Sequence, residues 1–227
     1  MKKRKMQINF LTIFPEIFNS YINESILLRA QKKGIIKFKS INIRGFSLDK
    51  HKKVDAKPYG GGAGMVMQIE PIFRALKSAV SSGIKRKKQR VILLSAKGKL
   101  FKQSDAKRLS KYNELIFICG RYEGIDERIT KFIDEEISIG EYVLTGGELP
   151  ALTIADSVIR LIPGVISERS LKEESYSTEN NVEYPQYTRP EVFEYKDFKT
   201  KKIKKVKVPK ILTSGDHKKI EKWRNKK

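Results

Sequence analysis

The sequence predicts an α/β protein built around a parallel β-sheet with helices on both faces. Apolar segments of strand length alternate with longer helical segments between residues 90 and 161, which is the pattern of successive βα units. Two of the apolar segments, 90–95 and 115–119, are nearly continuous hydrophobic runs, as in strands that are buried on both faces. With 227 residues, the chain is long enough for a full core and for a second small domain.

The expected elements follow from hydrophobic periodicity and from the positions of Pro and Gly. The sequence predicts strands at 7–13, 38–43, 90–95, 115–119 and 136–139. It predicts helices at 15–23, 25–33, 70–81, 102–111, 125–132, 149–161 and 218–224. A Gly-rich segment, 44–68, is expected to be a long loop, and loops of this length in compact domains are usually functional or disordered. We expect three parts: a main domain (1–165), a polar linker (166–190) and a basic C-terminal domain (191–227).

The formal net charge of +22 suits a polyanionic partner, either nucleic acid or an anionic membrane surface. The 48 basic residues comprise 35 Lys and 13 Arg, so an AT-rich genome is an alternative explanation for part of this charge. No apolar run approaches the length of a membrane span, and the N-terminus lacks the pattern of a signal peptide. We therefore expect a cytoplasmic protein with no membrane partner.

Metal and nucleophile motifs are missing from the sequence. The single Cys119 excludes an internal disulfide and a cysteine-based zinc site. His51 and His217 stand alone, which argues against a histidine-based site. We predict no bound metal, and the sequence does not specify whether Mg²⁺ is required for activity.

Three glycine-bearing segments each follow an expected strand, at 95–98 (SAKG), 119–124 (CGRYEG) and 138–148 (SIGEYVLTGGE). One such segment alone would usually be a tight turn. Three on consecutive parallel strands predict a ligand cleft, because ligands bind beyond the carboxyl ends of strands in open α/β sheets. The glycine-rich segment 60–65 lacks the Lys-Ser/Thr of a phosphate-binding loop, and no G-x-G-x-x-G follows the first strand.

Several motifs in a fixed order cover nearly the whole chain: LTIFPEIF (11–18), DKHKKVDAKPYGGGAGMVM (49–67), CGRYEGIDER (119–128), DEEISIGEYVLTGGELPALTIADSVIRLIPGV (134–165), YPQYTRPEV (184–192) and SGDHKKIEKWR (214–224). With these motifs the sequence resembles the bacterial tRNA (guanine-N1)-methyltransferases, the TrmD family of the SPOUT superfamily. The resemblance implies methyl transfer from S-adenosylmethionine to N1 of the guanine just 3′ of the anticodon. It also implies a trefoil-knotted sheet domain, a small helical C-terminal domain and a homodimer whose active sites are built from both subunits. tRNA is then the expected partner, and DNA is not.

The resemblance also assigns residues to roles. It places S-adenosylmethionine on three loops, at Leu94, Ser95, Gly120, Tyr122, Glu123, Ser138, Ile139, Gly140, Glu141, Tyr142, Val143, Leu144, Gly146, Gly147 and Pro150. It implies RNA contacts at Lys50, Tyr59, Arg189, Ser214, His217, Lys218 and Arg224.

Two catalytic roles are carried over from the family. Guanine N1 must lose a proton, and negative charge then develops toward O6. The resemblance places the proton acceptor at Glu174 and the stabilising cation at Arg160. From the residues alone, Arg160 would be half of an i,i+4 pair with Asp156, and the pair Glu173-Glu174 would be solvated linker charge.

Three features depart from the family pattern. Ala96-Lys97 replaces the usual Pro-Gln, Glu174 replaces an Asp, and the sequence given ends at Lys227, which implies a shortened C-terminal domain. Two alternatives therefore stay open: a non-catalytic RNA-binding relative, and a methyltransferase for ribosomal RNA or a ribose 2′-hydroxyl.

Overall fold

The computed structural model describes residues 5–167, 170–171, 175 and 184–224. They belong to two compact units, Met1–Leu171 and Lys172–Lys227. The finer division expected at residues 165 and 190 remains a prediction.

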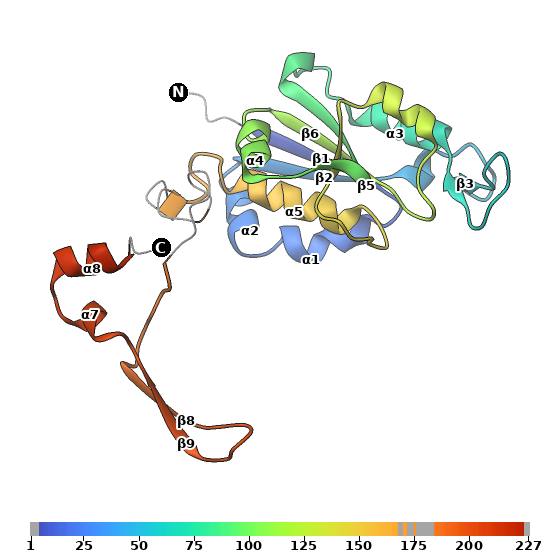
Figure 1. Ribbon diagram of the computed structural model, residues 1–227. Helices are drawn as coiled ribbons and strands as arrows, with labels where there is room; N and C mark the ends of the chain where they lie inside the picture. Colours follow the sequence, from blue (N-terminus) through green and yellow to red (C-terminus); the bar gives the residue numbers. More distant parts are fainter. Residues whose placement is uncertain (1–4, 168–169, 172–174, 176–183, 225–227) are drawn as a thin grey trace. The chain divides into compact units, whose positions relative to one another are not determined.

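The first unit contains a five-stranded sheet in the order β2-β1-β6-β5-β7 (Figure 1), and every neighbouring pair of strands is parallel. The strands are β1 (Met6–Thr12), β2 (Ile36–Asn42), β5 (Gln89–Leu100), β6 (Glu114–Cys119) and β7 (Glu135–Ser138). All six residues of β6 are buried, because this central strand is covered on both faces. The predicted α/β class and parallel sheet are confirmed.

Helices cover both faces of the sheet, as the sequence predicted (Figure 1). One face packs against α1 (Asn19–Ile22), α2 (Ser25–Lys32), α4 (Gln103–Leu109) and α5 (Glu148–Ile159), together with the 3₁₀ helix η1 (Pro15–Phe18). The other face packs against α3 (Ile69–Ala79) and the 3₁₀ helices η2 (Ile43–Phe46) and η4 (Glu127–Phe132). A last 3₁₀ turn, η3 (Arg86–Lys88), has no buried residue and leads into β5.

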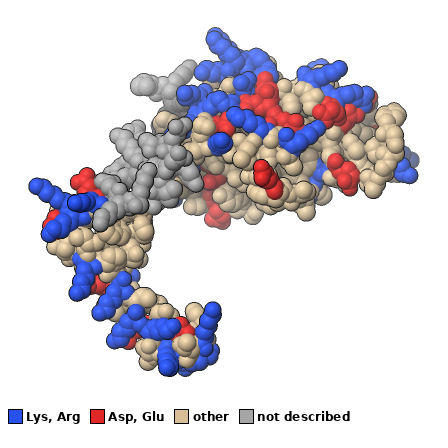
Figure 2. Space-filling view, viewed as in Figure 1, with Lys and Arg blue, Asp and Glu red and all other residues tan. Residues whose placement is uncertain are grey.

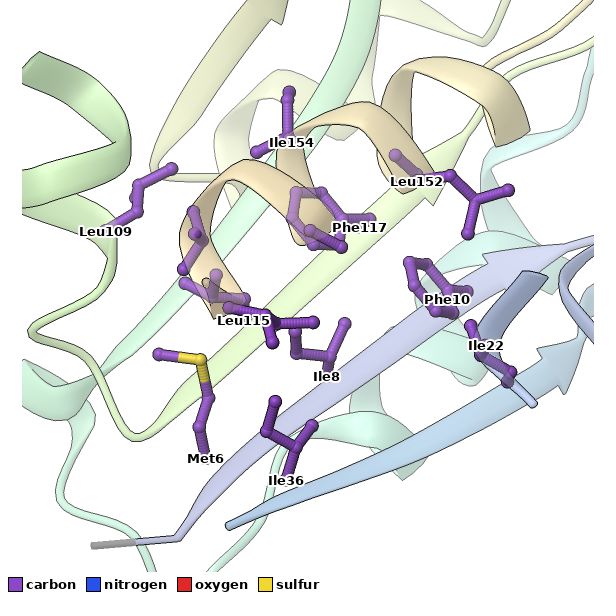
Figure 3. Close-up of a cluster of buried hydrophobic side chains, with 14 of the residues drawn as sticks. Met6, Ile8, Phe10, Ile22, Ile36, Leu109, Leu115, Phe117, Leu152 and Ile154 are labelled. Atoms are coloured by element: carbon purple, nitrogen blue, oxygen red, sulfur yellow. The ribbon is translucent and has the colours of Figure 1, made fainter. Parts of the chain in front are cut away.

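The core between the sheet and α5 contains an aromatic stack around Phe10 of β1, surrounded by aliphatic side chains (Figure 3). The ring of Phe10 stacks on Phe18 at a centroid distance of 4.1 Å and on Phe117 at 5.9 Å. All three side chains are fully buried. Such pairs contribute beyond the area they bury, so β1, β6 and η1 are fixed together at this point.

Strand β5 leaves the sheet and returns to it. Leu94 and Lys99 both pair with Ile137 of β7, and the residues between them form an outward loop. A Cβ at Gly98 would lie 2.6 Å from backbone atoms of Glu136 and Ile137. Only a glycine therefore permits this loop to lie so close to β7. The predicted strand at 90–95 thus corresponds to the first half of a longer, interrupted strand.

One region contains more structure than the sequence indicated, and one expected helix is of another type. The segment 44–68 holds η2 and a two-stranded antiparallel pair, β3 (Asp55–Ala56) and β4 (Val66–Met67). We call residues 55–67 the glycine arm. The helix expected at 125–132 is the 3₁₀ helix η4, in the connection from β6 to β7.

The second unit is only partly helical, which corrects the expected small helical domain. It contains an antiparallel hairpin of β8 (Val192–Lys196) and β9 (Ile203–Lys207), followed by α7 (Lys210–Thr213) and α8 (His217–Arg224). These strands were not predicted because their apolar residues, Phe193, Tyr195, Ile203 and Val206, lie among many lysines.

Replacing Phe10 by Ala should lower the free energy of unfolding by about 3–5 kcal/mol, since it removes the shared stacking partner and leaves a cavity. Urea denaturation followed by circular dichroism measures the loss. The control is Phe198→Ala, at a side chain that is 87% exposed, which should change stability by less than about 0.5 kcal/mol. Equal effects of both changes would contradict this description of the core.

Candidate functional site

A cavity of about 500 Å³ lies at the carboxyl ends of β5, β6 and β7. Its walls are the three glycine-bearing loops that follow these strands and the first turn of α5. The volume is in the range of small-molecule and cofactor sites. The three loops predicted from the sequence therefore surround one space, large enough for a nucleoside derivative.

Fourteen of the fifteen residues expected to bind the cofactor line this cavity. They are Leu94, Ser95, Gly120, Tyr122, Glu123, Ser138, Ile139, Gly140, Tyr142, Val143, Leu144, Gly146, Gly147 and Pro150. The exception is Glu141, which is exposed and does not line the cavity. The structure gives the position of these residues, while their contacts with a ligand stay a prediction.

Two glycines of the wall have no space for a side chain. A Cβ at Gly147 would lie 2.8 Å from the Cα of Cys119, and a Cβ at Gly140 would overlap the ring of Tyr142. The amide of Gly147 donates a hydrogen bond to the carbonyl of Gly120 (3.0 Å). The loop after β6 and the start of α5 are therefore joined through their main chains.

A buried carboxylate fixes the same corner of the cavity. Glu148, which is 1% exposed, accepts a hydrogen bond from Thr12 Oγ1 (2.6 Å) and one from Arg121 Nε (2.9 Å). Arg121 also donates from Nη1 to the carbonyl of Thr145 (3.1 Å) and lies over the ring of Phe14. Hydrogen bonds to both oxygens offset the cost of burying the charge. This cluster links the end of β1, the loop after β6 and the first turn of α5.

The glycine arm is attached to the cavity wall by main-chain hydrogen bonds. The amide of Glu123 donates to the carbonyl of Met65 (3.1 Å), that of Met67 to Gly124 (2.9 Å) and that of Asp126 to Met67 (3.0 Å). Tyr122 between them has a positive φ of 60°, and its hydroxyl accepts a hydrogen bond from Arg44 (3.3 Å). The arm and the loop 120–126 thus form one connected structure.

The structure adds a residue that the sequence analysis missed, Glu136 of β7. Its Oε1 atom is buried and has no hydrogen-bond partner within the described part of the chain, and the residue lines the cavity. An unsatisfied buried polar group costs about 1–3 kcal/mol, more if it is charged. No motif marked Glu136, because an acidic residue in the run Asp134–Glu136 is indistinguishable by sequence from surface charge.

The cavity is acidic although the chain is strongly basic. Its charged lining residues are Lys97, Arg121, Glu123, Glu127 and Glu136. Glu148 binds Arg121, and Glu127 forms an ion pair with Lys97 (2.6 Å). Glu123 and Glu136 remain, and neither has an ion pair among the described residues. The cavity is thus suited to a ligand that carries positive charge.

Arg160 is separated from the cavity. It is the C-cap residue of α5, ten residues beyond Pro150, which corresponds to roughly 15 Å of helix. The charge of Arg160 acts on Asp156, as the i,i+4 spacing suggested. Burial raises the pKa of Asp156, while the charge of Arg160 and a hydrogen bond from Tyr21 oppose this rise. Glu173 and Glu174 lie outside the described residues.

The residues expected to contact RNA are all exposed: Lys50, Tyr59, Arg189, Ser214, His217, Lys218 and Arg224. Tyr59, at the tip of the glycine arm, is fully exposed. Among the described residues there is no group of acidic, His or Cys side chains that could hold a metal ion. None of the described helices is long and apolar enough to span a bilayer.

Fold and cavity together define an α/β protein with a nucleoside-sized site at the carboxyl edge of a parallel sheet. A family model described as tRNA (Guanine-1)-methyltransferase TrmD matches residues 6–227. A protein from Dictyoglomus turgidum named tRNA (guanine-N(1)-)-methyltransferase is 51% identical, over 97% of this chain and 84% of its own length. Proteins of the same name from Clostridioides difficile and Mycoplasmopsis synoviae are 52% and 49% identical, over 96% and 97% of this chain and 90% and 91% of their own lengths.

The chain belongs to the TrmD family of tRNA (guanine-1)-methyltransferases. The family expected from the sequence motifs is thereby confirmed.

Replacing Glu148 by Ala should destabilise the protein by about 3–5 kcal/mol, because it leaves Arg121 and Thr12 without their common buried partner. Chemical denaturation gives the free energy of unfolding. The control is Glu127→Ala, which removes the exposed pair with Lys97 and should cost at most about 1 kcal/mol. If the control costs as much as Glu148→Ala, the buried cluster does not anchor the cavity.

Proposed function

We propose that the protein transfers a methyl group from S-adenosylmethionine to N1 of the guanine just 3′ of the anticodon in tRNA. One observation carries the proposal: the loops that hold the family motifs meet around a single cavity of suitable size, in a chain that matches the family model from residue 6 to 227.

The cavity fits S-adenosylmethionine in three respects. The lack of side chains at Gly140 and Gly147, where a Cβ has no space, gives the adenosine part access to the main chain of the surrounding loops. The acidic lining suits the positive charge of the cofactor. The unpaired Oε1 of Glu136 supplies an acceptor for one of its donor groups.

When bound, S-adenosylmethionine supplies an electrophilic methyl group, and the side chains must handle the proton and charge of guanine. Glu174 accepts the N1 proton, which makes N1 nucleophilic. Arg160 stabilises the negative charge that spreads to O6. The loops hold the methyl group in line with N1, and this alignment of the reacting atoms accelerates the transfer.

The position of Arg160 favours a homodimer with shared active sites. Arg160 lies at the opposite end of α5 from the cavity, so its own chain does not bring it to the bound cofactor. A second copy of the chain can supply it, and closed two-fold dimers are the commonest oligomers.

The second unit offers a surface for the tRNA backbone. The hairpin carries seven exposed lysines, namely Lys196, Lys199, Lys201, Lys202, Lys204, Lys205 and Lys207, against two acidic residues, Glu194 and Asp197. Figure 2 shows Lys and Arg side chains crowded over this unit. Such a surface binds phosphates without sequence preference, and we assign the specific RNA contacts to the exposed Tyr59 and Arg189.

We also propose the trefoil knot and a cytoplasmic location, both of which follow from the family.

Labelled S-adenosylmethionine and tRNA transcripts test the activity. The label should enter a transcript with guanine 3′ of the anticodon, but not one with adenine there, and mass spectrometry should find 1-methylguanosine. Glu174→Gln should lower the single-turnover rate by at least about 10², whereas Glu173→Gln should change it little. Methylation at another nucleotide or on a ribose would favour a different RNA methyltransferase, and binding of tRNA without turnover would favour the non-catalytic alternative.

Mixed dimers test the shared site. Arg160→Gln and Gly140→Val subunits should each be inactive, the first for lack of the cation and the second because the added side chain blocks the cavity. Mixed after joint denaturation and refolding, they should regain activity, because one site per mixed dimer combines an intact cavity with the partner's intact arginine. Activity that stays at the level of the separate variants would show that each site uses its own Arg160.

A further inference from the structure

The part of the cavity next to η4 has no role in the family assignments given above. It is lined by Lys97, Ile125, Glu127, Ile129, Thr130 and Glu136. Its apolar floor is closed by Ile129, which is fully buried. Two features of this region are chemically specific: the unpaired Oε1 of Glu136 and the ammonium of Lys97.

Glu136 requires a hydrogen-bond donor from outside the described chain. Glu136 is half-buried, and its Oε1 atom is buried and unsatisfied, whereas the fully buried carboxylate of Glu148 has both oxygens occupied. Buried polar groups in native proteins nearly always have partners. A charged donor forms the strongest hydrogen bond with a carboxylate, so a ligand ammonium satisfies this atom best.

Lys97 lies close to Glu136 and presents the opposite charge. The hydrogen bond to Glu127, and after it the charge of Glu136, raise the pKa of Lys97. The side chain is 61% exposed and donates to Glu127 at 2.6 Å. An ammonium group has three donors, so Lys97 can keep this bond and bind a further carboxylate.

A neighbouring anion and cation complement an α-amino acid, which is a zwitterion. We propose that the amino-acid end of S-adenosylmethionine binds between Glu136 and Lys97, with its ammonium on Glu136 and its carboxylate on Lys97. This assignment rests on the proposed function, since it requires that the cavity binds this cofactor. The adenosine part is then left to the main chain of the loops, where Gly140 and Gly147 allow a close approach.

Three ligands separate this role of Glu136 from other roles. S-adenosylmethionine has the amino-acid end and a sulfonium charge, S-adenosylhomocysteine has the amino-acid end without that charge, and 5′-methylthioadenosine has neither but keeps the ribose and adenine. Glu136→Gln removes the charge and keeps the shape. Titration calorimetry should show affinity for the first two ligands reduced roughly ten- to hundredfold and affinity for 5′-methylthioadenosine unchanged.

Lys97→Gln provides a second variant that cannot disturb the core, because the side chain is exposed. It should weaken the same two ligands and spare 5′-methylthioadenosine. Glu70→Gln, at an exposed acidic residue of α3 outside the cavity, is the charge-matched control and should leave all three affinities unchanged. Thermal unfolding should show Glu136→Gln to be at least as stable as the unmodified protein, since it removes an unsatisfied buried charge.

Other outcomes overturn the proposal in distinguishable ways. Loss of 5′-methylthioadenosine binding in Glu136→Gln would assign the residue to the ribose or adenine. Loss of S-adenosylmethionine binding alone would assign it to the sulfonium. Unchanged affinity for all ligands would leave it without a role in binding. If the unmodified protein binds none of the three ligands, the proposed function itself fails.

Discussion

The Glu148 carboxylate joins three segments that are far apart in the sequence, and the cavity takes its shape from that junction. Thr12 ends β1, Arg121 belongs to the loop after β6, and Glu148 begins α5. Arg121 strengthens the same junction, because its guanidinium lies over the ring of Phe14, just after β1, and donates to the carbonyl of Thr145, just before α5. The end of the loop that follows β7 lies beside Gly120, because the amide of Gly147 donates a hydrogen bond to the carbonyl of Gly120. Two walls of the site therefore depend on one buried acid.

Close packing of main chain forms the rest of the site. At Gly98 and at Gly147 two backbone segments approach so closely that a single methyl group would collide with backbone atoms. Where main chain forms a wall, recognition rests on amides and carbonyls, which are the same in every residue. In the proposed site, charge recognition is then left to a few side chains, such as Glu136 and Lys97. This division explains how a protein with a net charge of +22 keeps an acidic site.

The sequence predicted those parts of the fold that depend on local patterns. Buried parallel strands appear in the sequence as apolar runs, so β5 and β6 were identifiable. The glycine-bearing segments after β5, β6 and β7 located the cavity. Long-range features were not predictable. The return of β5 to β7 needs a contact at Gly98 that no spacing reveals, and the acidity of the cavity depends on which acids are already paired. The hairpin of the second unit was not predicted because four of the ten residues in its strands are lysines, a composition that is also typical of solvated segments. The catalytic role expected for Arg160 came from the resemblance to the family. Its separation from the cavity became visible only in the structure.

The attachment of the glycine arm to loop 120–126 has an energetic consequence. Three main-chain hydrogen bonds connect the segment bearing Tyr59 to the wall that contains Tyr122 and Glu123. In the proposed function, the cofactor binds this wall and RNA contacts Tyr59. A cofactor that orders the wall then restricts the arm as well, so this loss of conformational entropy is not incurred again when RNA binds. Linkage makes the effect reciprocal, so that RNA bound to the arm strengthens cofactor binding by the same factor.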